Sequence, residues 1–184
     1  MTEKDKRKWA LKLTVLGDAA VGKTSLIKKY ITGSFDLNYH PTLGVDITLK
    51  DIDLSEINSE VRLILWDIAG QDKYELTRKM FFQGCVGALL VYDVTRNSTF
   101  ENITSKWIND FKQYGRPNGI LVLIGNKIDM KDSIKIESEH GLKLSKDLKA
   151  VDFIETSAKY GDNVDKAFKK LVMSVLNNFG VKTN

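Results

Sequence analysis

The sequence predicts a single α/β domain with a six-stranded mixed sheet, one antiparallel edge strand and about five helices. Two observations carry this prediction. Over the second half of the chain, continuous apolar segments alternate with helical patterns, which is typical of parallel strands covered by helices on both faces. In the first half, two strand patterns are separated only by residues 55–60, which is too short for a crossover helix and predicts a hairpin.

Each element is predicted from its own apolar pattern. Strands are expected at residues 9–16, 45–54, 61–66, 88–92, 120–124 and 153–154. Apolar side chains recur every three or four positions in the segments expected to be helical, which are 23–31, 100–114, 137–149 and 164–179. The second strand is expected to slip near Asp51, and the apolar positions of the helix expected at 137–149 are Leu142, Leu144 and Leu148.

Composition and charge narrow the class of protein further. The 184 residues fit one domain at 9–179, between a charged tail at 1–8 and a short tail at 180–184. No apolar run reaches the length of a membrane span, and no signal-peptide core follows the first residues. The net charge of +4 comes without the aromatic and basic pattern of RNA-binding modules, so we expect no nucleic-acid partner. The single cysteine, Cys85, favours a reducing, cytoplasmic compartment.

A turn at residues 17–25 follows the first predicted strand and opens the first predicted helix. This is the context in which G-x-x-x-x-G-K-[ST] binds polyphosphate, because backbone N–H groups and the helix N-terminus surround the anion. Lys23 is expected to reach the β- and γ-phosphates, and the Thr24 hydroxyl to bind Mg²⁺. The residues expected to contact the nucleotide here are Asp18, Ala19, Ala20, Val21, Gly22, Lys23, Thr24 and Ser25.

Two further segments are expected at the phosphate end of the site. Thr42 lies in the long loop at 32–44 and can offer its hydroxyl to Mg²⁺. Asp67 follows the third predicted strand and can hold Mg²⁺ through water, while Gly70 can bring its N–H against the γ-phosphate. Gln71 can orient an attacking water. The catalytic residues predicted from these patterns are Gln71, Lys23, Thr42 and Gly70.

The segment Asn126-Lys127-Ile128-Asp129 follows the fifth predicted strand. A carboxylate accepts hydrogen bonds only, and guanine offers the two donors N1–H and N2–H₂, which adenine lacks. Asp129 is therefore predicted to select guanine, and the stem of Lys127 to lie over the base. Ser157, Ala158 and Lys159 follow the last predicted strand, where the Ala158 N–H can reach the guanine O6.

With these motifs in this order, residues 11–179 resemble the Ras-like small GTPases, a group of P-loop NTPases that share the Ras-like G domain. The segments 43–47, 65–67 and 81–85 are similar to signature segments of the Rab branch. The resemblance implies a GTP/GDP switch with Mg²⁺ and slow GTP hydrolysis. Its two switch loops, at about residues 36–43 and 70–80, are expected to be ordered by the γ-phosphate and Mg²⁺. It also implies that Phe35 packs beside the guanine and that Tyr39 belongs to the nucleotide site.

The resemblance further implies partners. Effectors are expected at the two switch loops and at an apolar triad formed by Ile47, Trp66 and Phe81. An exchange factor and a GTPase-activating protein are expected, and the chain is expected to be a monomer that works in the cytoplasm or peripherally at membranes. A role in vesicle or membrane trafficking follows from the Rab-like segments.

Several residues depart from the family pattern. Ala19 stands where Gly or Ser is usual, and its methyl group can crowd Gln71 and slow hydrolysis. Ile68, Asp72 and Ile47 also replace the usual residues. The last eight residues contain no cysteine, so no prenyl anchor is expected in this chain; whether that is native stays open.

Two alternatives remain at this point. One is a module that binds GTP with little or no hydrolysis, which Ala19 suggests. The other is a phosphate-loop ATPase or kinase, against which Asp129 argues.

Overall fold

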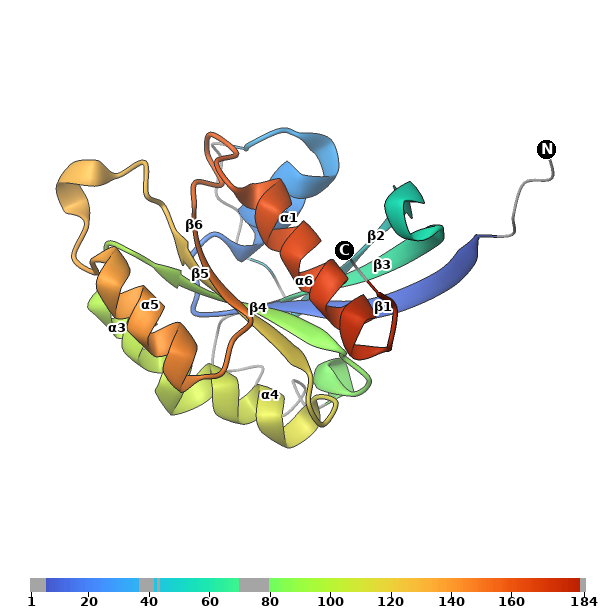
Figure 1. Cartoon of the computed structure of the whole chain (residues 1–184). Coiled ribbons are helices and arrows are strands. Elements are labelled where there is room, and N and C mark those ends of the chain that lie inside the picture. Colours follow the sequence, from blue (N-terminus) through green and yellow to red (C-terminus); the bar gives the residue numbers. More distant parts are fainter. Residues whose placement is uncertain (1–5, 37–41, 43, 70–79, 183–184) are drawn as a thin grey trace.

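The computed structural model of the chain describes residues 6–36, 42, 44–69 and 80–182. Six strands form one twisted sheet in the order β2-β3-β1-β4-β5-β6 (Figure 1). Among the strands of the described residues, β2–β3 is the one antiparallel pair, so the predicted mixed sheet is confirmed. The strands are β1 (Arg7–Leu16), β2 (Val45–Leu54), β3 (Ser59–Ile68), β4 (Gly87–Asp93), β5 (Ile120–Asn126) and β6 (Asp152–Thr156).

The predicted hairpin is present, and it is more regular than expected. β2 pairs with β3 without interruption from Val45 opposite Ile68 to Leu54 opposite Ser59, so the slip expected near Asp51 is wrong. Asp51 lies opposite Arg62, and the Arg62 guanidinium binds the carboxylate at 2.8 and 2.9 Å. This exposed cross-strand pair favours the in-register arrangement.

Helices cover both faces of the sheet (Figure 1). On one face, α1 and α6 join the core built by β1 and β3, where Tyr30 and Phe168 stack with ring centroids 4.1 Å apart. On the other face, the segment from α3 to α4 and helix α5 pack over β4 and β5. The helices are α1 (Lys23–Thr32), α3 (Asn97–Asn102), α4 (Ile108–Tyr114), α5 (Ser138–Asp147) and α6 (Val164–Asn178), with short 3₁₀ turns at Ser55–Ile57 and Lys131–Ser133.

Two helices differ from the prediction. The helix expected at 100–114 begins at Asn97 and contains a π-helical segment, η3 (Ile103–Trp107), between α3 and α4. In α5, one of the three expected apolar positions is not on the buried face: Leu142 is 49% exposed, whereas Leu144 is buried and Leu148 packs partly buried against the core. Gly141 also packs on this side of the helix, because a Cβ there would lie 2.2 Å from the ring of Phe153.

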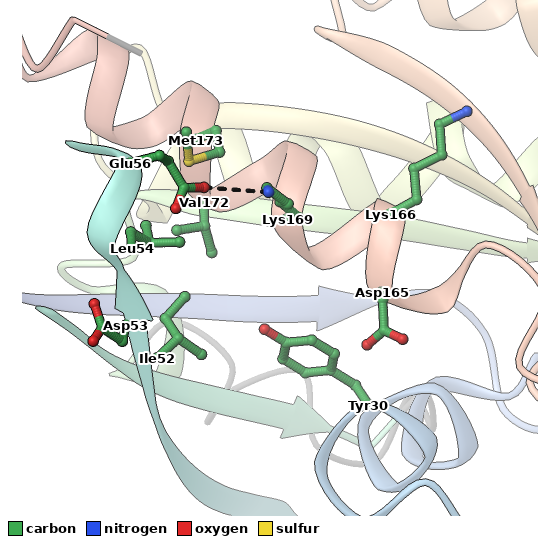
Figure 2. A pocket seen from close by; sticks show the side chains of 10 residues that line it. All are labelled: Tyr30, Ile52, Asp53, Leu54, Glu56, Asp165, Lys166, Lys169, Val172 and Met173. Carbon is green, nitrogen blue, oxygen red and sulfur yellow. Dashed lines mark ion pairs between the residues drawn. The ribbon is translucent and has the colours of Figure 1, made fainter. Parts of the chain in front are cut away.

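A pocket of about 340 Å³ lies between α1, β2 and α6 (Figure 2). Its apolar floor includes Ile52, Leu54 and Val172, and Glu56 and Lys169 form an ion pair at its rim. None of its lining residues belongs to the predicted phosphate or guanine motifs, so it is separate from the candidate site described below. Within the described part of the chain, no helix has the length and apolar character needed to cross a membrane.

Candidate functional site

The turn between β1 and α1 is packed against the ends of two neighbouring strands. Gly17 has φ 147°, and a Cβ there would lie 2.1 Å from the carbonyl oxygen of Val91 in β4. Gly22 has φ 102°, and a Cβ there would lie 2.3 Å from Nδ2 of Asn126 in β5. Both glycines are therefore required by packing within the protein, in addition to the close approach to phosphate for which the sequence predicts them.

Lys23 begins α1 and folds back into the turn. Its ammonium donates to the carbonyl oxygens of Gly17 at 2.9 Å and Asp18 at 2.8 Å, which uses two of its three N–H groups. The residue is 6% exposed. Burial lowers the pKa of the Lys23 ammonium to about 8, against the opposing charges of Asp67 and Asp18. The turn thus holds a buried positive charge at the N-terminus of a helix, which is a suitable environment for an anion.

The three residues predicted to bind Mg²⁺ come together at this point. The hydroxyl oxygens of Thr24 and Thr42 are 2.9 Å apart, and both groups donate to Oδ2 of Asp67, Thr42 at 3.4 Å. The Asp67 carboxylate is 3% exposed, and its Oδ1 has no hydrogen-bond partner among the described residues. Burial raises the pKa of the Asp67 carboxyl, although the Thr24 hydroxyl and the Lys23 charge act the other way.

This donor set fits Mg²⁺. The ion prefers oxygen ligands and commonly uses one or two carboxylates together with water and substrate phosphates. Two hydroxyls and a buried carboxylate oxygen without a partner supply those ligands beside Lys23.

Asn126 links the phosphate-binding turn to the loops after β5 and β6. Its Nδ2 donates to the carbonyl oxygen of Val21 at 2.8 Å. Its Oδ1 accepts from the Thr156 hydroxyl at 3.0 Å and from the Ala158 N–H at 3.2 Å. Asn126 is 1% exposed, so these bonds are made in the interior. The sequence predicts the Ala158 N–H as a donor to guanine; in this structure its bond is with Asn126.

The remaining base-side residues lie at the same edge of the sheet. Oδ1 of Asp129 accepts from the Ser157 hydroxyl at 2.7 Å, so the two predicted guanine motifs are in direct contact. The Lys159 ammonium lies 5.0 Å from the centre of the exposed Tyr160 ring. Phe35 is partly buried against the core cluster that contains α1 and α6.

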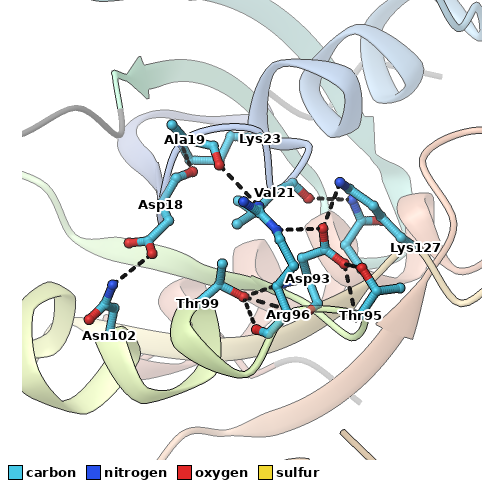
Figure 3. Close-up of polar contacts among 11 residues, drawn as sticks. Asp18, Ala19, Val21, Lys23, Asp93, Thr95, Arg96, Thr99, Asn102 and Lys127 are labelled. Atoms are coloured by element: carbon cyan, nitrogen blue, oxygen red, sulfur yellow. Dashed lines mark hydrogen bonds and ion pairs between the residues drawn. The ribbon is translucent and has the colours of Figure 1, made fainter. Parts of the chain in front are cut away.

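Asp93, which belongs to none of the predicted motifs, is the buried centre of an ionic network (Figure 3). It is 1% exposed and lies 2.6 Å from Lys127 Nζ and 3.0 Å from Arg96 Nε. Its Oδ1 also accepts from the N–H and hydroxyl of Thr95, at 2.9 and 2.6 Å. Burial alone would raise the pKa of the Asp93 carboxyl, but the bonds from Lys127 and Thr95 lower it on balance.

The sequence signal for this network is an aspartate at the carboxyl end of the buried strand β4, which ends beside the other strand termini. The network also includes Lys127, whose side-chain stem is expected to lie over the base. Its ammonium is committed to Asp93, so only the stem of the side chain is left to lie against a base.

Asp18, predicted to contact the nucleotide, uses its side chain differently. Its carboxylate accepts from Asn102 Nδ2 and from Trp107 Nε1, each at 2.7 Å, in the helix that follows β4 (Figure 3 shows the Asn102 bond). What Asp18 offers within the turn is its backbone, since its carbonyl oxygen accepts from Lys23.

Two other groups of predicted residues can be placed or set aside. Tyr39, Gly70 and Gln71 lie outside the described residues. The apolar triad is assembled: Ile47 is opposite Trp66 in the hairpin and 48% exposed, and the rings of Trp66 and Phe81 are 6.0 Å apart.

The fold and the site together define a phosphate-loop nucleotide-binding protein of the α/β class. Comparison with known proteins makes this specific. A model of the Ras family matches residues 12–177. The chain is 36% identical to the Ras-related protein Rab-13 of Canis lupus familiaris, over 90% of this chain and 79% of that protein. It is 34% identical to the Ras-related protein RABA6b of Arabidopsis thaliana, over 89% of this chain and 70% of that protein.

A third relative matches a larger share of the chain. The Ras-related protein Rab-8B of Pongo abelii is 32% identical over 96% of this chain and 83% of its own length. The chain therefore belongs to the Ras family, and it is a Rab-like small GTPase, a class of GTP hydrolases. The fold and the family predicted from the motifs are confirmed, and the two alternatives, a non-hydrolysing module and an ATPase, are not favoured.

Proposed function

We propose that this chain binds GTP and GDP with Mg²⁺ in one site and switches between the two states by slow hydrolysis. The observation that carries the proposal is the convergence of the Thr24, Thr42 and Asp67 oxygens beside the buried Lys23. The residues proposed to contact the nucleotide are Asp18, Ala19, Ala20, Val21, Gly22, Lys23, Thr24, Ser25, Phe35, Tyr39, Thr42, Gly70, Asn126, Lys127, Asp129, Ser157, Ala158 and Lys159.

The proposed division of labour follows from the contacts. The N–H groups of the turn and the Lys23 ammonium bind the phosphates, and Asp129, supported by the Ser157 hydroxyl, selects guanine. Thr24, Thr42 and Asp67 hold Mg²⁺, which when bound neutralises charge on the β- and γ-phosphates. Gln71, with the Thr42 carbonyl, positions the water. Without an arginine from a partner, turnover is expected on the order of 10⁻⁴ to 10⁻³ per second.

Membership of the Ras family supports partners of three kinds: effectors, an exchange factor and a GTPase-activating protein. We place the effector surface at the switch loops and at Ile47, Trp66 and Phe81. The Lys12 ammonium lies 3.7 Å from the centre of the Trp66 ring, and this cation–π contact helps to hold the ring of the effector surface in place. We propose a trafficking role for a monomer that acts in the cytoplasm and peripherally at membranes.

The experiment that tests the proposal is single-turnover hydrolysis of GTP by the purified protein with Mg²⁺, with the bound nucleotide identified by chromatography. We expect bound GDP and slow release of phosphate. Gln71→Leu should lose most of the hydrolysis and keep GTP binding, because only the group that orients water is removed.

The matched control is Gln83→Leu, which changes an exposed glutamine just after the second loop and should hydrolyse at the wild-type rate. Equal hydrolysis in Gln71→Leu and wild type would refute the role of Gln71. Bound GTP with no phosphate released over a day would instead mean that the chain holds GTP without turning it over.

A further inference from the structure

Arg96 connects the phosphate-binding turn to the guanine-binding loop. It directly precedes α3, and its guanidinium has partners on two sides (Figure 3). Nε donates to Oδ2 of Asp93 at 3.0 Å, and Nη2 donates to the backbone carbonyl oxygen of Ala19 at 3.0 Å. The guanidinium is a rigid planar fork, so each bond restricts the direction of the other.

The Asp93 carboxylate and the Arg96 backbone, which position the guanidinium, are themselves held by further contacts. The buried carboxylate of Asp93 also pairs with Lys127, at 2.6 Å. The Arg96 backbone N–H donates to the Asp93 carbonyl oxygen at 3.0 Å, and the Arg96 carbonyl oxygen accepts from the Thr99 hydroxyl at 2.8 Å. The guanidinium therefore reaches Ala19 from a position that both its backbone and its ion pair define.

Holding the Ala19 carbonyl sets the direction of the next N–H group. A trans peptide is planar, with C=O and N–H on opposite sides, and the described residues contain no cis peptide. With the Ala19 oxygen bound to Arg96, the N–H of Ala20 points away from Arg96. Ala20 has φ 61°, the left-handed conformation with which a turn brings successive N–H groups together around an anion.

The preceding residue is held from the same side of the molecule. The Asp18 carboxylate binds Asn102 and Trp107, each at 2.7 Å, and both belong to the helix that Arg96 precedes. Two consecutive residues of the turn are thus fixed by the segment 96–107. Fixing the turn before a ligand arrives reduces the ordering that binding requires.

We propose that Arg96 is a positioning residue for the nucleotide. By holding the Ala19 carbonyl it aims the Ala20 N–H at the phosphates, and through Asp93 and Lys127 it couples this donor to the loop that binds guanine. The inference rests on the nucleotide site proposed above and adds a residue that no motif contains. The Arg96 guanidinium binds protein groups, the Asp93 carboxylate and the Ala19 carbonyl oxygen. We therefore expect it to change the affinity for the diphosphate and not the rate of the chemical step.

The test is the rate at which radiolabelled GDP leaves the full chain in Mg²⁺ with excess unlabelled GDP. The variants are Arg96→Lys, which keeps a cation beside Asp93 without the two-sided fork, and Arg96→Gln, which removes the charge. A hydrogen bond that involves a charged group is strong enough for about a ten- to hundredfold faster release when it is lost. The matched control is Arg62→Lys, at an arginine that binds Asp51 through two bonds on the exposed hairpin; its release rate should stay at the wild-type value.

A second readout separates positioning from a general loss of stability. In ¹⁵N-labelled, GDP-bound protein, the Ala20 amide proton should move upfield in Arg96→Lys and stay in place in Arg62→Lys, because only the first change frees the Ala19–Ala20 peptide. Wild-type GDP release together with an unmoved Ala20 signal would overturn the proposal.

Another result would overturn it as well: unchanged GDP release with a large loss of single-turnover hydrolysis, which would assign Arg96 to the reaction itself. Failure of the wild-type chain to bind GDP is a different outcome, because it would refute the proposed nucleotide site before Arg96 is considered.

Discussion

Asp129 and Asp132 lie in one loop after β5, and they differ in their surroundings. Asp129 is half-buried and accepts a hydrogen bond from Ser157 at 2.7 Å, whereas Asp132 is exposed in the short 3₁₀ turn Lys131–Ser133. With Oδ1 bonded to Ser157, Oδ2 is the oxygen that we propose for a base. Guanine, with two adjacent donors, is the base that matches it.

We therefore predict that Asp129→Asn weakens GDP binding strongly. The amide keeps the size of the side chain and an acceptor for Ser157, but it replaces one acceptor for guanine by a donor. The loss of bonds to a charged group predicts an increase in the dissociation constant of about 10²- to 10⁴-fold. Titration calorimetry with GDP measures it, and Asp132→Asn is the control; similar affinities in the two variants would refute selection of guanine by Asp129.

At this scale the sequence predicts residue types better than their partners. The roles expected of Thr24, Thr42 and Asp67 agree with their convergence, because a short motif at a known strand end restricts where its side chains can lie. The sequence could not show that the Asp18 carboxylate binds Trp107, or that Lys127 pairs with Asp93. These partners are distant in the sequence and meet only when the strands are placed side by side.

The helical segment from Asn97 to Tyr114 is a second case in which the sequence pattern does not predict the structure that long-range contacts accompany. Apolar spacing predicts a continuous helix, yet the structure has five π-helical residues at Ile103–Trp107. A π segment shifts the helix face by one residue, and such segments are frequent at functional sites. Here it ends at Trp107, the residue whose indole reaches the phosphate-binding turn. Apolar spacing within 100–114 cannot reveal this contact, because Asp18 is distant in the sequence.

We predict that this contact stabilises the element measurably. Trp107→Phe removes the indole N–H bond to a carboxylate and keeps most of the ring packing, so the free energy of unfolding should fall by about 2 kcal/mol. Trp9→Phe is the matched control, since the buried Trp9 Nε1 has no hydrogen-bond partner among the described residues. Urea unfolding of both variants measures the difference. An equal loss in the two would mean that ring packing alone, without the bond to Asp18, accounts for the effect.

At the scale of the whole molecule, the site depends on the order of the strands. β1, β3, β4, β5 and β6 are parallel, so their carboxyl ends lie at one edge of the sheet. The phosphate turn, Asp67, Asp93, Asn126 and the loop after β6 lie at or directly after these ends. The alternation of strands and helices is enough to predict this gathering. What it leaves out is the ionic network that fixes the loops to one another, because the meeting of the buried Asp93 with Arg96 and Lys127 follows from tertiary packing.

Because the site joins several elements, ligand binding should stabilise the whole fold. Anything that binds the folded state alone adds RT ln(1 + [L]/Kd), which is about 4 kcal/mol at a thousandfold excess over Kd. For a chain of this size that predicts a rise in Tm of about 8–16 °C with GDP and Mg²⁺. ADP at the same concentration should give little change, and chelating Mg²⁺ should remove part of the GDP effect.

The variant Asp67→Asn tests how much of the rise in Tm depends on Mg²⁺ bound by this carboxylate. The amide keeps an acceptor for Thr24 but removes the charge that Mg²⁺ requires, so the variant should keep the shift given by GDP alone and lose the additional shift given by Mg²⁺. Asp46→Asn is the matched control, because Asp46 lies opposite Asp67 in the hairpin and is exposed. If Mg²⁺ raises the Tm of GDP-bound Asp67→Asn as much as that of Asp46→Asn, then the buried carboxylate does not hold the metal, and Thr24 and Thr42 must do so without it.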